Sequence, residues 1–135
     1  MPRIIKLTVA YEGADYCGWQ RQPNGVSIQA ALEAALSRIE GSAVAVVGAG
    51  RTDAGVHALG QVASVRLEHP IDVGDLTRAL NATLPVDIRV LAAVEMPDRF
   101  DARGSAIGKL YRYQILTGPI VSPFDRRHVW HLPYP

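Results

Sequence analysis

The sequence is poor in cysteine, in long apolar segments and in lysine. Its one cysteine, Cys17, cannot form an internal disulfide, and a single thiol also excludes zinc sites built from several cysteines at the usual spacing. The sequence contains no run of eighteen apolar residues and no signal-peptide pattern. We therefore predict a cytoplasmic protein with no membrane partner.

Net charge is also small. A formal value of +1 gives little reason by itself to expect a nucleic-acid partner. However, residues 99–135 hold six basic and two acidic side chains, whereas residues 1–98 hold eight basic and eleven acidic ones. Arginine, whose fork suits phosphate, outnumbers lysine twelve to two, although a GC-rich genome produces the same bias. The basic carboxy-terminal part is therefore a candidate phosphate-binding surface.

The chain has no internal repeat, low-complexity stretch or linker, so residues 1–135 are expected to form a single domain. Alternating apolar residues predict strands, and apolar residues at helical spacing behind a capping side chain predict helices. The expected strands are Ile4–Tyr11, Val44–Val47, Gln61–Leu67, Ile88–Met96 and Leu110–Leu116, and the expected helices run from the caps Ser27 and Asp72 to about Glu40 and Leu84. The tail after residue 124 is basic and aromatic and predicts no further core element.

This element order, β-α-β-β-α-β-β, predicts an α+β fold. We expect a mixed, mainly antiparallel sheet with two helices on one face, as in split β-α-β folds. The other face of the sheet would be free to bind something large.

Residues Gly48–Gly60 form the most unusual stretch, with four glycines among thirteen residues. This density indicates tight reversals or close approach of another molecule to the backbone. Arg51 and Asp53 stand at its centre, and in an extended segment their side chains share a face and can pair. A carboxylate on a turn beside a cation is suited to act as a nucleophile. An Asp-x-Gly sequence between strands is also common as an ordinary turn, so both interpretations stay open on the residues alone.

The glycines do not form a known phosphate cradle. The dinucleotide fingerprint that begins at Gly48 needs a third glycine at the position that Asp53 occupies, and no lysine follows as in a P-loop.

Three other residues have two interpretations each. Trp19 lies in a polar loop and suits either stacking on a base or covering the edge of the core. Tyr111, on the expected strand 110–116, suits either stacking or the core. His57 could serve acid–base chemistry, but its position beside the turn favours a structural role.

Three blocks of residues, taken together, resemble the TruA family of tRNA pseudouridine synthases. The blocks are Tyr11-Glu12-Gly13 with Tyr16-Cys17-Gly18-Trp19-Gln20-Arg21-Gln22, then Gly50-Arg51-Thr52-Asp53-Ala54-Gly55-Val56-His57-Ala58, then Phe100-x-Ala102-Arg103 with Lys109-x-Tyr111-Arg112-Tyr113. The second block is highly specific. The resemblance covers essentially the whole chain and corresponds to the amino-terminal half of the family's proteins.

The resemblance implies an enzyme, an isomerase of tRNA processing, that converts uridine to pseudouridine in the anticodon stem-loop, at tRNA nucleotides 38–40. It implies no cofactor and no metal. By resemblance Asp53 is the catalytic nucleophile, Arg51 pairs with it and helps to open the RNA stem, and Tyr111 stacks against the target base. Attack at the ribose C1′ and addition at uracil C6 both remain open. The resemblance also implies a homodimer of the complete protein with tRNA as its partner.

The carboxy-terminal half of the family's proteins has no counterpart in this chain. We therefore expect the chain to be the amino-terminal catalytic half, a fragment, because Pro133-Tyr134-Pro135 resembles the start of a connection. Two chains that pair to replace the missing half are the alternative. A truncated, non-catalytic RNA-binding module and a structural or dimerisation piece are the competing functions.

Overall fold

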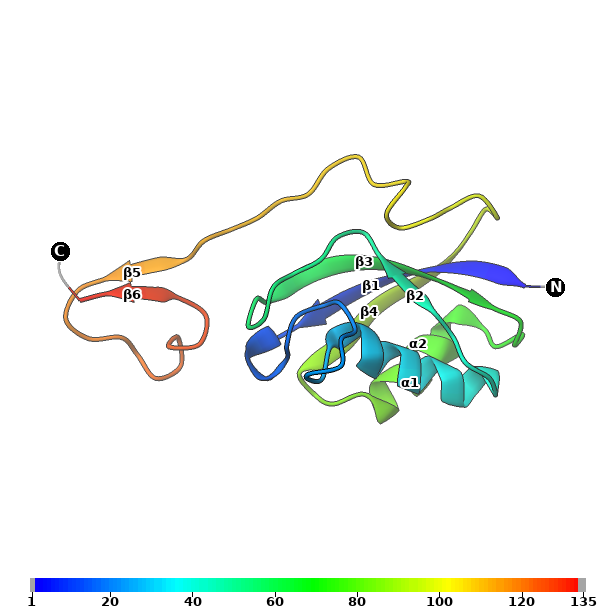
Figure 1. The fold of residues 1–135 in the computed structure, drawn as a ribbon, viewed down its shortest axis with the longest axis horizontal. Coiled ribbons are helices and arrows are strands. Elements are labelled where there is room, and N and C mark those ends of the chain that lie inside the picture. The colour runs from blue at the N-terminus through cyan, green and yellow to red at the C-terminus, as the bar shows by residue number, and fades with distance from the viewer. Residues whose placement is uncertain (1, 134–135) are drawn as a thin grey trace.

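The computed structural model describes residues 2–133, and Figure 1 shows a sheet with helices packed on it and a long arm that leads away from them. The body, residues 3–96, contains the strands β1 (Arg3–Tyr11), β2 (Val46–Gly48), β3 (Ala58–Leu67) and β4 (Ile88–Met96) and the helices α1 (Ile28–Glu40) and α2 (Val73–Thr83). A 3-10 helix, η1 (Gly13–Asp15), follows β1. The arm, residues 104–133, holds the short strands β5 (Ile115–Thr117) and β6 (Trp130–Leu132). The predicted α+β class is confirmed.

The four strands of the body pair in the order β2-β3-β1-β4, and every pairing is antiparallel. The first strand of the chain therefore lies inside the sheet, between two strands that come much later. Its residues Ile5, Leu7 and Val9 are fully buried toward the helices, as the alternating pattern predicted. We expected a mixed sheet with some parallel pairing. The four-stranded sheet has none within the described residues, and the parallel pair is that of β5 and β6 in the arm.

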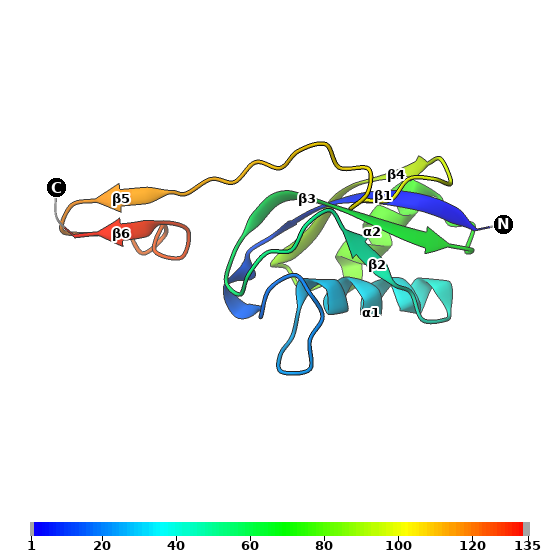
Figure 2. The same cartoon turned by 45° about the horizontal axis from the view of Figure 1, so that its top comes forward.

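Both helices pack on the same face of the sheet, as Figure 2 shows. The side chain of Ser27 accepts a hydrogen bond from the Ala30 N–H (3.1 Å) at the start of α1, and Gly41 ends the helix with a left-handed φ of 82°. Asp72 caps α2 by accepting from the Gly74 N–H (2.9 Å). Both caps and both helix ends agree with the prediction.

Helix α1 also fixes the short edge strand that leads into the glycine-rich stretch. The side chain of Glu33 accepts from the Val46 N–H (2.9 Å), and the side chain of Gln29 donates to the Val46 carbonyl (2.8 Å). Both polar side chains are buried, so these bonds satisfy groups that water cannot reach. The start of the stretch is thus held by a helix as well as by β3.

We expected the sheet face opposite the helices to be free, but part of it is covered. After β4 the chain crosses this face, and the N–H of the buried Ala102 donates to the Ser64 hydroxyl (3.0 Å). This contact covers part of the face and sets where the arm begins.

The expected strand Leu110–Leu116 is wrong over most of its length, because only Ile115–Thr117 is a strand. A strand exists only through the hydrogen bonds of a neighbour, and within residues 2–133 the segment before Ile115 has no neighbouring strand. Its large apolar side chains, including those of Leu110 and Tyr113, are exposed. The strand β6 was not predicted. Tyr134 and Pro135, expected to begin a connection, lie outside the described residues.

Candidate active site

Residues 49–57, between β2 and β3, are anchored at the start and turn in the middle. Ala49 donates its N–H to the Val62 carbonyl (2.8 Å), and the Gln61 side chain donates to the Gly50 carbonyl (2.7 Å). Further on, Gly55 has a φ of 81° and the Val56 N–H bonds the Asp53 carbonyl (3.1 Å). We call residues 51–57 the Asp53 turn.

A second loop, residues 12–22, supports the Asp53 turn. The Trp19 N–H donates to the Thr52 carbonyl (3.0 Å), and the Gly55 N–H donates to the Tyr16 carbonyl (3.3 Å). A side chain at Gly18 would place its Cβ 2.7 Å from the Thr52 carbonyl oxygen, and Gly18 has a φ of 106°. Here glycine is required by contact between two loops of the protein itself.

The sequence left two roles open for Trp19, stacking on a base or covering the core. The structure places its side chain in the core, where it is not available to a base. Its side chain is 1% exposed and its ring stacks on Tyr11 at a centroid distance of 6.2 Å. A Cβ at Gly48 would lie 2.5 Å from the indole Nε1. The indole therefore packs between Tyr11 at the end of β1 and Gly48 at the end of β2.

Arg51 and Asp53 both point to solvent, whereas Thr52 between them is half-buried. The Thr52 hydroxyl lies 2.9 Å from the hydroxyl of the buried Tyr11. Within the described residues no ion pair joins Arg51 to Asp53, so the expected pairing is not formed here. The physical reason is that an exposed pair gains little attraction in water and costs side-chain freedom.

The arm brings two further side chains to this turn. The Lys109 ammonium lies so close to Gly50 that a Cβ there would be 2.5 Å from Nζ. The side chain of Tyr111 is 64% exposed, which excludes the core position that the sequence left open. Burial raises the pKa of the Tyr11 phenol, hydrogen bonds from Thr52 and Gln61 oppose that rise, and the nearby Tyr111 adds to it. Lys109 thus lies against Gly50 beside the Asp53 turn, and Tyr111 follows it by two residues.

His57 has the structural role that its sequence position favoured. Its Nδ1 accepts the Gly13 N–H (2.9 Å), so its Nε2 carries the proton and donates to the Arg127 carbonyl (2.7 Å). The ring meets His128 edge-on at 5.0 Å. Both ring nitrogens are therefore engaged in holding backbone.

Beside His57 the far part of the arm contacts the body through charges. Arg127 lies 3.5 Å from Glu12 and 3.4 Å from Asp15, and His128 donates to the Glu12 carboxylate (2.7 Å). The bond from His128, with Arg127 nearby, holds the pKa of the Glu12 carboxyl below its ordinary value.

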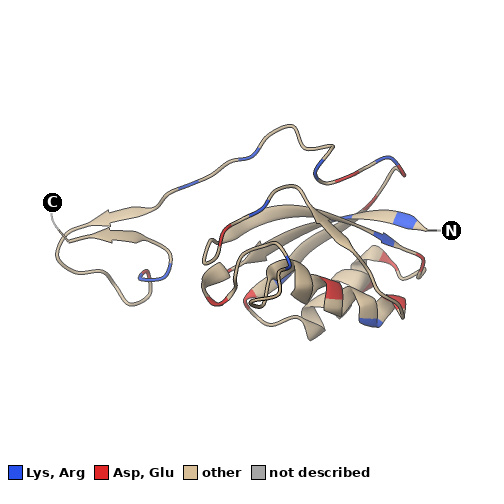
Figure 3. Cartoon of the chain, viewed as in Figure 1, with Lys and Arg blue, Asp and Glu red and all other residues tan. Residues whose placement is uncertain are grey.

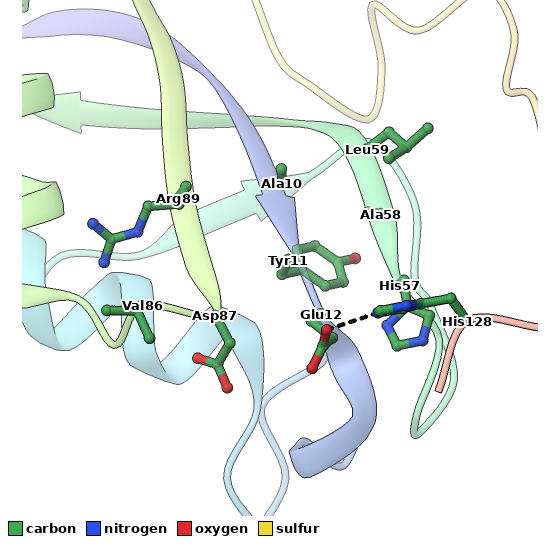
Figure 4. A pocket seen from close by; sticks show the side chains of 10 residues that line it. All are labelled: Ala10, Tyr11, Glu12, His57, Ala58, Leu59, Val86, Asp87, Arg89 and His128. Carbon is green, nitrogen blue, oxygen red and sulfur yellow. Dashed lines mark hydrogen bonds and ion pairs between the residues drawn. The ribbon is translucent and has the colours of Figure 1, made fainter. Parts of the chain in front are cut away.

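An open pocket of about 490 Å³ lies at the same end of the sheet, and Figure 4 shows the side chains around it. They are Ala10, Tyr11, Glu12, His57, Ala58, Leu59, Val86, Asp87, Arg89 and His128. Arg51, Asp53 and Tyr111 are not among them. The Asp53 carboxylate therefore stands on an exposed turn beside this pocket's wall and does not line it.

Within residues 2–133 no three histidine, cysteine or acidic side chains gather closely enough to hold a metal ion. The part of the chain that the structure describes holds no helix both long and apolar enough to cross a membrane.

Two tyrosines near the site, Tyr11 and Tyr16, have raised pKa values, from which we predict a loss of stability in alkali. The Tyr16 hydroxyl donates to Asp87 (2.6 Å), and burial together with that carboxylate raises the pKa of Tyr16 well above the ordinary value of 10.0. The pKa of Tyr11 is also raised. A raised pKa means that the folded state holds its protons longer than the unfolded chain, so this contribution is complete below pH 10 and declines above it. We expect the free energy of unfolding to fall between about pH 10 and 12.

The check is urea unfolding followed by circular dichroism at several pH values. Tyr16→Phe has no phenol to ionise, so its stability should decline less over that window than that of the unchanged protein. An equal decline in both would contradict the assignment.

The sequence did not single out Tyr11, Thr52 or Lys109 for a role at the turn. A signal for Tyr11 was present, because it ends an alternating strand on its buried face and carries a hydroxyl there. Its partner Thr52 could not be identified, because the two residues meet only in the folded chain.

Comparison with known proteins gives one consistent result. The family described as tRNA pseudouridine synthase matches residues 7–103. A protein named tRNA pseudouridine synthase A from Rhodopseudomonas palustris is 52% identical over 136 residues, covering 100% of this chain and 54% of its own length. The proteins of that name from Solibacter usitatus and Syntrophotalea carbinolica are 46% and 45% identical, covering 98% and 96% of this chain and 55% and 51% of their own lengths. The chain thus spans about half the length of these curated relatives.

Proposed function

The chain belongs to the tRNA pseudouridine synthase family, and we propose that it is the amino-terminal catalytic half of an enzyme that isomerises uridine to pseudouridine in the anticodon stem-loop of tRNA. Asp53 is the proposed nucleophile, Tyr111 the residue that stacks on the target base, and Arg51 the residue that helps to open the stem. One observation supports this assignment above others: Asp53 is exposed on a turn braced by a second loop, and Lys109, two residues before Tyr111, lies against Gly50 beside that turn.

The proposed chemistry requires no cofactor. In the route through C1′, the Asp53 carboxylate attacks the ribose carbon, and the C1′–N1 bond breaks with its electrons left on the uracil. The uracil turns, C5 bonds to C1′, and the C1′–O bond to Asp53 breaks. The C5 proton is lost and N1 gains one, so the product is an isomer of the substrate. In the other route the carboxylate first adds to uracil C6.

A base inside an RNA stem is out of reach of any exposed carboxylate, so the uridine must leave its stack. Extrusion costs a few kcal/mol. Stacking on an aromatic side chain recovers roughly 1–3 kcal/mol, and Tyr111 is exposed and available for that contact. A guanidinium such as that of Arg51, also exposed, can occupy the vacated place and bind phosphate.

A non-catalytic RNA-binding module is the second candidate, because the basic arm supports binding without chemistry. Figure 3 shows basic positions spaced along the chain from the crossing into the arm. The side chains of Lys109 and Arg112 are exposed there. Exposed cations along an extended segment attract phosphates whatever the base sequence.

Both candidates predict salt-sensitive binding of tRNA to this chain. Between about 50 and 200 mM salt the affinity should fall with a slope set by the number of neutralised phosphates. Arg112→Gln should reduce that slope by about one. Filter binding over this range gives the slope. Arg78→Gln is the matched control, because Arg78 lies on α2 and pairs with Asp75. A slope of zero, or equal loss in the control, would contradict binding by the arm.

The catalytic proposal is tested in a hybrid protein, in which residues 1–135 replace the matching first half of the Rhodopseudomonas palustris relative. Tritium release from tRNA labelled at uracil C5 measures the reaction, because that proton is lost when C5 bonds to the ribose. We expect the hybrid to release tritium. A hybrid that binds tRNA without releasing tritium, while the unaltered relative is active, would favour the binding module.

For the complete protein we propose a homodimer and a cytoplasmic location, where its tRNA substrate is found. Sedimentation of the hybrid protein decides the first, since a monomer at working concentration excludes the dimer.

A further inference from the structure

Thr52 is the one residue of the sequence Arg51-Thr52-Asp53 whose side chain is turned toward the body. Its hydroxyl lies 2.9 Å from the Tyr11 hydroxyl, and its carbonyl accepts the Trp19 N–H at 3.0 Å. Arg51 and Asp53 are exposed on either side of it. Thr52 is therefore held by two separate bonds, one to its side chain and one to its backbone.

The Tyr11 hydroxyl is a fixed point in the molecule. Tyr11 is the last residue of the central strand β1, where it pairs with Ala58 of β3 and with Ile88 of β4. Its side chain is only 4% exposed, and its ring stacks on the buried Trp19. A ring packed in this way cannot change rotamer without disturbing the core.

We propose that Tyr11 and Thr52 form a positioning pair that fixes the Asp53 turn and thereby the direction in which Asp53 presents its carboxylate. Thr52 is tied inward while Arg51 and Asp53 on either side of it are exposed, so the bond to Thr52 sets how both neighbours face solvent. The part of this inference that concerns catalysis rests on the proposed function. Tyr11 acts through Thr52 and does not itself touch the reacting atoms.

The surroundings of the Tyr11 hydroxyl agree with this role. The Gln61 side chain donates to the Gly50 carbonyl (2.7 Å) just before the turn, and Gln61 itself pairs with Val9, two residues before Tyr11 on β1. The buried phenol therefore contacts the turn next to a second bond that holds the start of the turn.

The first measurement needs no activity. In the chain of 135 residues, hydrogen exchange followed by NMR reports on two amides of the turn: Gly55 bonds the Tyr16 carbonyl of the second loop, and Val56 bonds the Asp53 carbonyl. Tyr11→Phe removes the hydroxyl and keeps the ring in the core. We expect these two amides to exchange about tenfold faster, with the amides of β1 unchanged. Unchanged exchange at the turn would overturn the positioning pair.

The second measurement uses tritium release by the hybrid protein. Misplacing a reacting group by about 1 Å costs on the order of 10²-fold in rate. We expect Tyr11→Phe and Thr52→Val each to lower kcat about tenfold or more, with KM for tRNA within about twofold. Thr52→Ser keeps the hydroxyl and should retain the original kcat. The double variant Tyr11→Phe/Thr52→Val should be no slower than either single one, because both remove the same bond.

Tyr16→Phe is the matched control, because it removes a phenol that bonds Asp87 and not the turn. Its kcat should be unchanged. A higher KM with unchanged kcat in Tyr11→Phe, additive losses in the double variant, or no rescue by Thr52→Ser would each overturn the catalytic part. If the unaltered hybrid releases no tritium, the proposed function fails, and hydrogen exchange still decides whether Tyr11 holds the turn.

Discussion

Replacing Asp53 by asparagine in the hybrid protein should reduce tritium release on the order of 10⁴-fold or more while tRNA binding survives. Asparagine has the size and shape of aspartate, so the exposed turn keeps its structure, but its amide is too weak a nucleophile to form the covalent intermediate. The Asp53 side chain supports no hydrogen bond or ion pair within the described residues, so its loss leaves no partner unsatisfied. Removal of a negative charge near RNA phosphates should leave affinity equal or slightly higher.

Asp98→Asn is the control, because Asp98 is also exposed but follows β4, away from the turn. It should retain full activity. Single-turnover measurements with enzyme in excess would detect a slow residual reaction. Turnover by Asp53→Asn at an undiminished rate would remove Asp53 from the mechanism and leave the fold intact.

Trp19→Ala should lower the free energy of unfolding by about 3–5 kcal/mol. The indole is almost wholly buried, stacks on Tyr11 and fills the space over Gly48, so its removal leaves a cavity that the surrounding strands cannot close. Domains of this size have a stability of roughly 5–15 kcal/mol, so the variant would retain little or none of it. Urea unfolding followed by circular dichroism measures the change without relying on tryptophan fluorescence.

Trp130→Ala provides the comparison, because Trp130 lies on β6 in the arm and is 61% exposed. It should change stability by less than about 1 kcal/mol. Similar losses in the two variants would mean that the core does not depend on Trp19 as described. Trp19→Phe, which keeps an aromatic ring over Gly48, should recover part of the loss and separates cavity formation from general misfolding.

The helices could be predicted from the sequence because the signals that start and end them are local. Ser27 and Asp72 each accept an N–H from a residue two or three positions away, and Gly41 needs only its own backbone freedom. Strand Ile88–Met96 was predicted to the residue. The strand expected at Leu110–Leu116 could not be predicted reliably from local residues. Its side chains alternate as in a strand, but a strand forms only where a neighbouring strand pairs with it.

The sequence predicted where the candidate site residues lie in the chain, but not which of them contact one another. Turn chemistry located Asp53, but whether Arg51 would meet it depended on solvent exposure, which spacing does not reveal. The glycines of residues 48–60 indicated tight reversals or close approach of another molecule; Gly55 does make a reversal, with a φ of 81°, whereas Gly48 is crowded by Trp19 of the same chain. The bond between Tyr11 and Thr52 joins residues 41 positions apart, so only the folded chain discloses it.

The central place of β1 in the sheet affects how the protein is made. A ribosome adds about 5–20 residues per second, so β4 is complete roughly 4–17 seconds after β1 has been synthesised. Until β3 is complete, roughly 3–11 seconds after β1 at the same rate, β1 has neither neighbouring strand, so Ile5, Leu7 and Val9 lie on an unpaired strand. Helix α1 is synthesised before β3 and β4, so its apolar stripe is the first surface on which the buried face of β1 can pack.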